Sequence, residues 1–77
     1  MLEKIIDILA KYSEVDKSQI NRDSSLAVDL GLTSLDVLRI VMDLEEEFGI
    51  EFDEDEIADL ITISDLEEYI KKQNRGE

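Results

Sequence analysis

The chain has 77 residues, 21 of them acidic and 8 basic, and a formal net charge of -13. This length supports one small domain, residues 1–77, in which we expect about the last five residues to be disordered. The charge repels nucleic acid and anionic membranes and attracts basic protein surfaces, and the absence of cysteine and histidine excludes disulfides, Cys/His zinc sites and the commonest general base.

No stretch of the sequence approaches the roughly 20 apolar residues that span a bilayer. The N-terminus MLEKIIDILA also lacks the basic start and long apolar run of a signal peptide. We therefore expect a cytoplasmic protein, or the mature form of an organellar one, that does not bind membranes. We also expect a monomer.

The first predicted helix covers residues 2–12, whose apolar side chains recur at helical spacing between charged ones. These side chains are Leu2, Ile5, Ile6 and Leu9. Residues 13–33 follow as a long loop, with apolar residues placed too regularly for a disordered linker. The loop residues that we expect to hold it to the core are Val15, Ile20, Leu26, Val28, Leu30 and Leu32.

The clearest helix signal starts at Thr33, because Thr33 and Asp36 have the spacing of a capping box. That places Ser34 in the first turn. The helix should run to about Phe48 and stop at Gly49, which suits the left-handed conformation that closes helices.

This second helix carries two apolar stripes. The first is the predicted core face, made of Val37, Ile40, Val41, Leu44 and Phe48. The second, made of Leu35, Leu38 and Met42, occupies a side where polar residues are expected, and it predicts an exposed docking strip bordered mostly by acids. Alternatively, Leu35 and Leu38 pack beneath the long loop, and Met42 distinguishes the two interpretations because it lies farther from the loop's end.

Two further pairs with capping-box spacing predict the remaining helices. Asp53 and Glu56 introduce a short third helix, and Ser64 and Glu67 introduce a fourth that frays after Lys72. The apolar residues assigned to the third helix are Ile57, Leu60 and Ile61. Together the elements predict an all-α bundle of four helices with a long first loop.

Ser34 is the candidate functional residue. A serine in the first turn of a helix lies where free backbone N–H groups and the helix dipole favour negative charge, so a phosphate attached there is well accommodated. Taken alone, such a serine is more often a plain helix-start residue, because nothing nearby would activate it as a nucleophile.

The surrounding motif changes this interpretation. The run DLGLTSLD from Asp29 to Asp36, followed by LEEEFGI from Leu44 to Ile50, resembles the signature of the acyl carrier protein family, and the likeness extends over nearly the whole chain. The resemblance implies that Ser34 carries 4'-phosphopantetheine, added by a separate phosphopantetheinyl transferase that uses coenzyme A. The protein would then be a phosphoprotein that carries acyl thioesters and is not an enzyme.

The resemblance also implies two surfaces. The second helix would recognise acyl-transferring and condensing enzymes with basic surfaces, and an acyl chain would shelter between the helices. The matching recognition positions are Leu35, Asp36, Leu38, Arg39, Met42, Asp43, Glu46 and Glu47. The positions expected to line the acyl pocket are Leu44, Leu60 and Ile61.

Two positions depart from the family's pattern. Thr33 stands where the usual motif has aspartate, and Arg39 places a cation on the recognition helix, where like charge facing a basic partner is costly. The pathway therefore stays open between fatty-acid synthesis and a specialised polyketide or lipid pathway.

The sequence also leaves other function classes open. The nearest is a peptidyl or aminoacyl carrier, and another is an unmodified acidic interaction module that binds a partner helix. The acidic run from Glu51 to Glu56 lacks the glycine and ligand spacing of an EF-hand, so we expect no metal site. Catalysis by Ser34 itself is disfavoured, because no His or Lys is placed to activate it.

Overall fold

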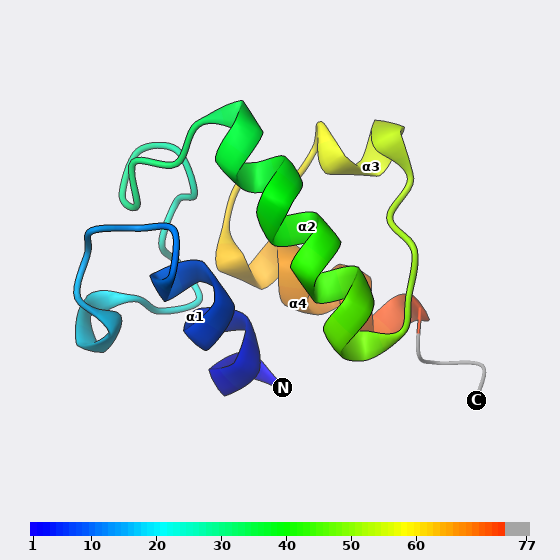
Figure 1. Cartoon of the computed structure of the whole chain (residues 1–77), viewed down its shortest axis with the longest axis horizontal. Coiled ribbons are helices and arrows are strands. Elements are labelled where there is room, and N and C mark those ends of the chain that lie inside the picture. Colours follow the sequence, from blue (N-terminus) through cyan, green and yellow to red (C-terminus); the bar gives the residue numbers. More distant parts are fainter. Residues whose placement is uncertain (74–77) are drawn as a thin grey trace.

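The computed structural model describes residues 1–73, which form a bundle of four α-helices (Figure 1). The helices are α1 (Leu2–Ala10), α2 (Ser34–Phe48), α3 (Glu54–Ile57) and α4 (Ile63–Gln73), and a short 3-10 helix covers Lys17–Gln19. Within this described range the only β-type pairing is an isolated bridge between Ser25 and Thr62. The predicted all-α class is confirmed, whereas the expected disorder at the C-terminus falls mainly on residues 74–77, outside the described residues.

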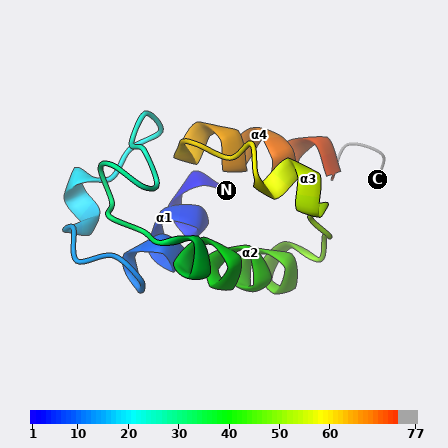
Figure 2. The same ribbon diagram turned by 90° about the horizontal axis from the view of Figure 1, so that it is seen from above.

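The bundle places α2 and α4 on opposite sides, with α1 between them at one end and α3 toward the other (Figure 2). Contacts join α1 to both α2 and α4. The side chains that are almost completely removed from solvent come from these three helices: Ile5, Leu9, Ile40, Leu44, Ile63, Leu66 and Ile70. The four-residue α3 contributes no buried residue to this core.

The long loop is held against the core, as its apolar pattern predicts. Its buried apolar side chains are Ile20, Leu26, Leu30 and Leu32. Val28 is an exception, because it is 84% exposed, so the prediction that it anchors the loop is wrong. The loop turns outward there, where the backbone N–H of Val28 donates to Ser25 Oγ at 3.2 Å. The first helix also ends at Ala10 rather than at residue 12.

Both ends of α2 form as the sequence predicts. Thr33 Oγ1 accepts from the Asp36 backbone N–H at 3.2 Å, and Asp36 Oδ2 accepts from the Thr33 N–H at 3.1 Å, which completes a capping box. At the other end Gly49 has φ 66° and its N–H donates to the Glu45 carbonyl. The helix start is therefore fixed at Ser34 by side-chain hydrogen bonds.

The third helix is shorter and less capped than predicted. Asp53 forms no side-chain capping bond, and α3 ends at Ile57, so Leu60 and Ile61 lie beyond the helix. The segment before α3 is held by an aromatic pair instead, because Phe52 and Tyr69 stack with ring centroids 4.4 Å apart. The Tyr69 hydroxyl also accepts from the Asp53 N–H at 3.2 Å.

The fourth helix begins before the predicted Ser64 and Glu67 pair, and that prediction is wrong. The capping residues are Thr62 and Asp65: Thr62 Oγ1 accepts from the Asp65 N–H at 3.3 Å, and Asp65 Oδ2 accepts from the Thr62 N–H at 3.0 Å. Contacts between α4 and the long loop decide where the helix begins. The first free N–H groups of α4, at Ile63 and Ser64, donate to loop carbonyl groups instead of requiring a cap at Ser64.

Glu67 consequently turns into the bundle and pairs with the long loop. Arg22 Nη2 donates a hydrogen bond to Glu67 Oε2 at 3.3 Å, and Arg22 Nε lies 3.2 Å from Glu67 Oε1 in the same ion pair, so the guanidinium meets both carboxylate oxygens. The Glu67 side chain is 7% exposed and the Arg22 side chain 58%. The backbone adds to this join, since the Leu26 N–H donates to the Ile61 carbonyl at 2.9 Å.

Candidate functional site

Ser34 lies at the exposed N-terminus of α2, where the capping box fixes the backbone on either side of it. This end of α2 carries the positive end of the helix dipole and the free backbone N–H groups of the first turn. This environment suits an attached phosphodiester, because the negative charge would lie next to these donors.

The two carboxylates nearest to Ser34 in the sequence form no hydrogen bond with its hydroxyl. The carboxylates nearest in sequence are both used in folding the backbone: Asp29 Oδ2 accepts from the Ser25 N–H at 2.7 Å, and Asp36 Oδ2 accepts from the Thr33 N–H. An enzyme-type nucleophile needs a base within hydrogen-bond reach. The geometry therefore fits a serine on which another protein acts.

A pocket of about 400 Å³ opens beside Ser34, between the N-terminal half of α2, the end of the long loop and the α3–α4 connection. Its walls are mostly apolar: Leu26, Ala27, Leu32, Val37, Leu38, Ile57, Ala58, Leu60 and Ile61, with Ser25, Thr33 and Ser34 at the polar edge. A surface of this kind can take a flexible apolar chain attached at its edge.

The three residues expected to line an acyl pocket separate in the structure. Leu60 and Ile61 do line the pocket beside Ser34. Leu44 does not, because it is completely buried in the core two turns farther along α2. Leu44 is therefore no wall of the pocket beside Ser34, and its contact with an acyl chain stays a prediction.

The second apolar stripe of α2 faces outward. Leu35 is 58% exposed, Leu38 47% and Met42 65%, although all three are apolar. This exposure excludes packing of Leu35 and Leu38 beneath the long loop. Met42, the residue that distinguishes the two interpretations, is exposed as well. The strip is a surface without a partner among the described residues.

Some of the charged residues predicted for recognition form hydrogen bonds or ion pairs within the fold, and others do not. Asp36 is used in the capping box, and Glu47 pairs with Lys4 at 3.3 Å on the surface. Arg39 and Glu46 are exposed and form no ion pair with any residue that the structure describes.

Asp43 has a partner that sequence reasoning missed. Its Oδ2 accepts a hydrogen bond of 2.5 Å from the hydroxyl of Tyr12, which follows the end of α1. This bond raises the pKa of Tyr12 above its ordinary value, because the neutral phenol is the form that donates. The two residues are 31 positions apart, so no local pattern could have shown their contact.

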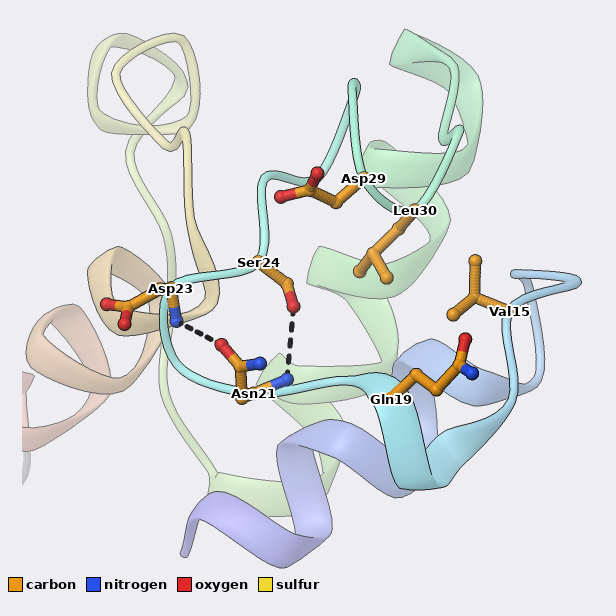
Figure 3. A pocket seen from close by; sticks show the side chains of 7 residues that line it. All are labelled: Val15, Gln19, Asn21, Asp23, Ser24, Asp29 and Leu30. Atoms are coloured by element: carbon orange, nitrogen blue, oxygen red, sulfur yellow. Dashed lines mark hydrogen bonds between the residues drawn. The ribbon is translucent and has the colours of Figure 1, made fainter.

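A second pocket, of about 420 Å³, lies within the long loop (Figure 3). Its polar groups fold the loop: the Asn21 N–H donates to Ser24 Oγ at 3.1 Å, and the Asp23 N–H donates to Asn21 Oδ1 at 2.9 Å. Among residues 1–73 no group of three or more His, Cys, Asp or Glu side chains could hold a metal ion. We assign no ligand to this pocket.

No helix in the described part of the chain has the length and apolar character needed to cross a membrane.

Comparison with known proteins points to one family. A family model described as a phosphopantetheine attachment site matches residues 3–70. The chain is 36% identical to an acyl carrier protein of Thermotoga maritima, covering 95% of this chain and 90% of that protein. It is 39% identical to one of Clostridium acetobutylicum, covering 92% of each, and 38% identical to one of Campylobacter hominis, covering 99% of this chain and 96% of the relative.

A solved structure agrees with these sequence matches. An acyl carrier protein from Enterococcus faecalis superposes with a TM-score of 0.82 at 25% identity, covering 95% of this chain and 92% of that one.

Proposed function

The chain belongs to the acyl carrier protein family, whose domain carries covalent 4'-phosphopantetheine, and we propose that Ser34 is the residue that holds this arm. The observation that carries the proposal is the position of Ser34: exposed, first in a capped helix, and at the polar edge of an apolar pocket. Acyl groups would be bound as thioesters to the thiol of the arm, since the chain itself has no cysteine.

The attachment step needs a separate transferase. Ser34 Oγ forms the new bond to phosphorus, the phosphoanhydride bond of coenzyme A breaks, and adenosine 3',5'-bisphosphate leaves. The hydroxyl proton passes to a base of the transferase or to water, because Asp29 and Asp36 are engaged with backbone N–H groups. In this role the chain is a substrate and not a catalyst.

The pocket beside Ser34 would shelter part of the acyl chain. Its apolar walls give the chain a place out of water, and each methylene buried there is worth about 0.8 kcal/mol. The partner enzymes would dock on the exposed strip of α2 through basic surfaces, with the protein acting as a monomer in the cytoplasm. We also propose that residues 1–77 act as a single carrier domain.

Intact-mass measurement after incubation with a phosphopantetheinyl transferase and coenzyme A tests the proposal. We expect a gain of one phosphopantetheine on the unchanged chain and none on Ser34→Ala. Ser18→Ala is the matched control, because Ser18 is an exposed serine on the 3-10 helix, and it should be modified normally. Modification of Ser34→Ala, or none of the unchanged chain, would show that Ser34 does not carry the arm.

The cargo is proposed to be an acyl group of fatty-acid, polyketide or other lipid synthesis. The names of the relatives favour an acyl over an aminoacyl cargo. Incubating the protein carrying its arm with acyl-activating and amino-acid-activating enzymes separates the two. Efficient loading by the amino-acid enzymes alone would contradict an acyl cargo.

A further inference from the structure

Four side chains form a line on the outward side of α2, opposite its core face. They are Leu35, Arg39, Met42 and Glu46, spaced by four, three and four residues. With 3.6 residues in each turn, they fall within a sector of about 60°. Leu35 and Met42 are 58% and 65% exposed, and Arg39 and Glu46 are also exposed. The line therefore presents a cation and an anion with an apolar side chain between them.

Among residues 1–73 the Arg39 guanidinium has no ion-pair partner. Asp36 and Asp43 stand three and four residues away, the spacing at which helix side chains pair. One oxygen of each carboxylate is held by a hydrogen bond, because Asp36 Oδ2 accepts from the Thr33 N–H and Asp43 Oδ2 accepts from the Tyr12 hydroxyl. Arg39 forms no ion pair within the described residues. Its planar set of N–H donors is free to bind a carboxylate at two points.

The free anion of the line is Glu46. Its neighbour Glu47 pairs with Lys4, and Glu45 Oε2 accepts from the Phe52 N–H at 2.8 Å. Glu46 forms no such contact in the part of the chain that the structure describes. Since Arg39 and Glu46 are seven residues apart, their positions are separated by about 10 Å along the helix axis.

The line lies next to Ser34. Arg39 is five residues from Ser34, which is about 7.5 Å along the helix axis, and Leu35 follows Ser34 directly. An enzyme that brings coenzyme A to the Ser34 hydroxyl has to cover this part of α2. A purely basic docking surface would meet like charge at Arg39, which is unfavourable.

We propose that the transferase that modifies Ser34 docks on this line with a mixed surface. A carboxylate of the transferase faces Arg39, an apolar contact covers Met42, and a lysine or arginine about 10 Å farther along faces Glu46. The inference rests on the proposed function, because it needs an enzyme that acts at Ser34. The inference adds that the transferase recognises the order of charges along α2, with Arg39 nearer to Ser34 and Glu46 farther from it.

The sign of the effect at Arg39 tests the proposal. The measurement is kcat/KM for phosphopantetheine transfer, with the transferase of the organism from which the chain comes, at low ionic strength. We expect Arg39→Gln to lower kcat/KM about threefold and Arg39→Glu about tenfold, mainly through KM, because an attraction is first lost and then reversed. Glu46→Gln and Glu46→Lys should give losses of the same order.

Lys71→Glu is the matched control for net charge, since Lys71 is an exposed cation on α4. We expect it to stay within about twofold of the unchanged chain. An Arg39→Glu chain that reacts as fast as, or faster than, the Lys71→Glu chain would overturn the proposed carboxylate. Helix content measured by circular dichroism shows that each variant is folded.

Charge reversal on the enzyme provides the second readout. Each surface Asp or Glu of the transferase is changed to arginine in turn. One of these transferase variants should modify the Arg39→Glu chain with a kcat/KM about tenfold higher than the original transferase does. The same variant should modify the unchanged chain with a kcat/KM about tenfold lower. If none does, the proposal is wrong. If the unchanged chain gains no mass at all, the proposed function fails, which is a different result from normal modification with no dependence on Arg39.

Discussion

Replacing Arg22 with alanine should lower the free energy of unfolding by about 2 kcal/mol, because the Glu67 carboxylate then loses its only charged partner among the described residues. Arg22 and Glu67 join the long loop to α4 with two N–O contacts of 3.2 and 3.3 Å. The backbone bond from the Leu26 N–H to the Ile61 carbonyl joins the loop end to the α3–α4 connection, which form two walls of the pocket beside Ser34.

The expected magnitude follows from the unequal burial of the two partners. An exposed ion pair contributes up to about 1 kcal/mol, whereas removing one partner of a fully buried pair costs about 3–5 kcal/mol. Here the Glu67 side chain is 7% exposed and the Arg22 side chain 58%, so solvent screens the pair from one side only. A loss of about 2 kcal/mol corresponds to a fall in Tm of about 8–16 °C for a domain of this size.

Urea unfolding followed by circular dichroism measures this loss, with Arg39→Ala as the matched control. Arg39 is an exposed arginine without an ion pair in residues 1–73, so its removal should change the free energy of unfolding by less than about 0.5 kcal/mol. A double-mutant cycle isolates the pair: in a Glu67→Gln background, Arg22→Ala should have little further effect. A loss below about 0.5 kcal/mol for Arg22→Ala in the unchanged chain would refute the reasoning.

Three further predictions concern the ends of the helices. Thr33→Ala should cost about 1 kcal/mol in chemical unfolding because it removes the cap of α2, whereas Thr33→Asp should cost less than half of that because it keeps a capping oxygen. Gly49→Ala should cost about 1 kcal/mol from its φ of 66° alone, since an added Cβ meets no atom within 4 Å. The raised pKa of Tyr12 stabilises the fold fully below about pH 10, and this contribution is lost as pH rises through the higher folded value. Tyr12→Phe should therefore flatten the alkaline fall in stability.

Each of these predictions has a result that contradicts it. Equal stability of Thr33→Ala and the unchanged chain would mean that the capping box contributes nothing to α2. A Gly49→Ala variant as stable as the parent would show that the backbone there relaxes without strain. If Tyr12→Phe follows the same alkaline stability curve as the parent, the hydrogen bond to Asp43 is not the cause; Lys17, whose pKa is also raised, is present in both chains and does not affect the comparison.

The parts of the fold that the sequence predicts well are those set by local signals. The start and end of α2 follow from Thr33, Asp36 and Gly49, which act within one turn of the helix. The outward strip was equally readable, because an apolar stripe opposite a complete core face has no place inside a small bundle.

The errors arise where the tertiary structure decides between equivalent local patterns. Thr62 and Asp65 have the same spacing as Ser64 and Glu67, and only the loop carbonyl groups that meet the first N–H groups of α4 select the earlier start. The inward turn of Glu67 depends on Arg22, 45 residues away in the sequence.

The candidate site shows the same division. Ser34 and the outward strip follow from the motif and its periodicity, but the pocket's walls come from three separate segments that only the folded chain brings together. The resemblance implies Leu44 as an acyl-pocket residue, whereas in the structure it is completely buried in the core and does not line the pocket beside Ser34.

The α3 segment is fastened at its two ends and little in between. Asp53 is tied to the Tyr69 hydroxyl, and Thr62 is tied to Asp65, but the helix between them has no buried residue and no side-chain cap. Its backbone amides should therefore exchange with solvent through local opening that leaves α1, α2 and α4 intact. Ile57 and Ala58 form part of the pocket wall, so local opening of α3 would change the width of the pocket beside Ser34. Hydrogen exchange of the α3 amides, compared before and after an acyl chain is attached, measures this effect.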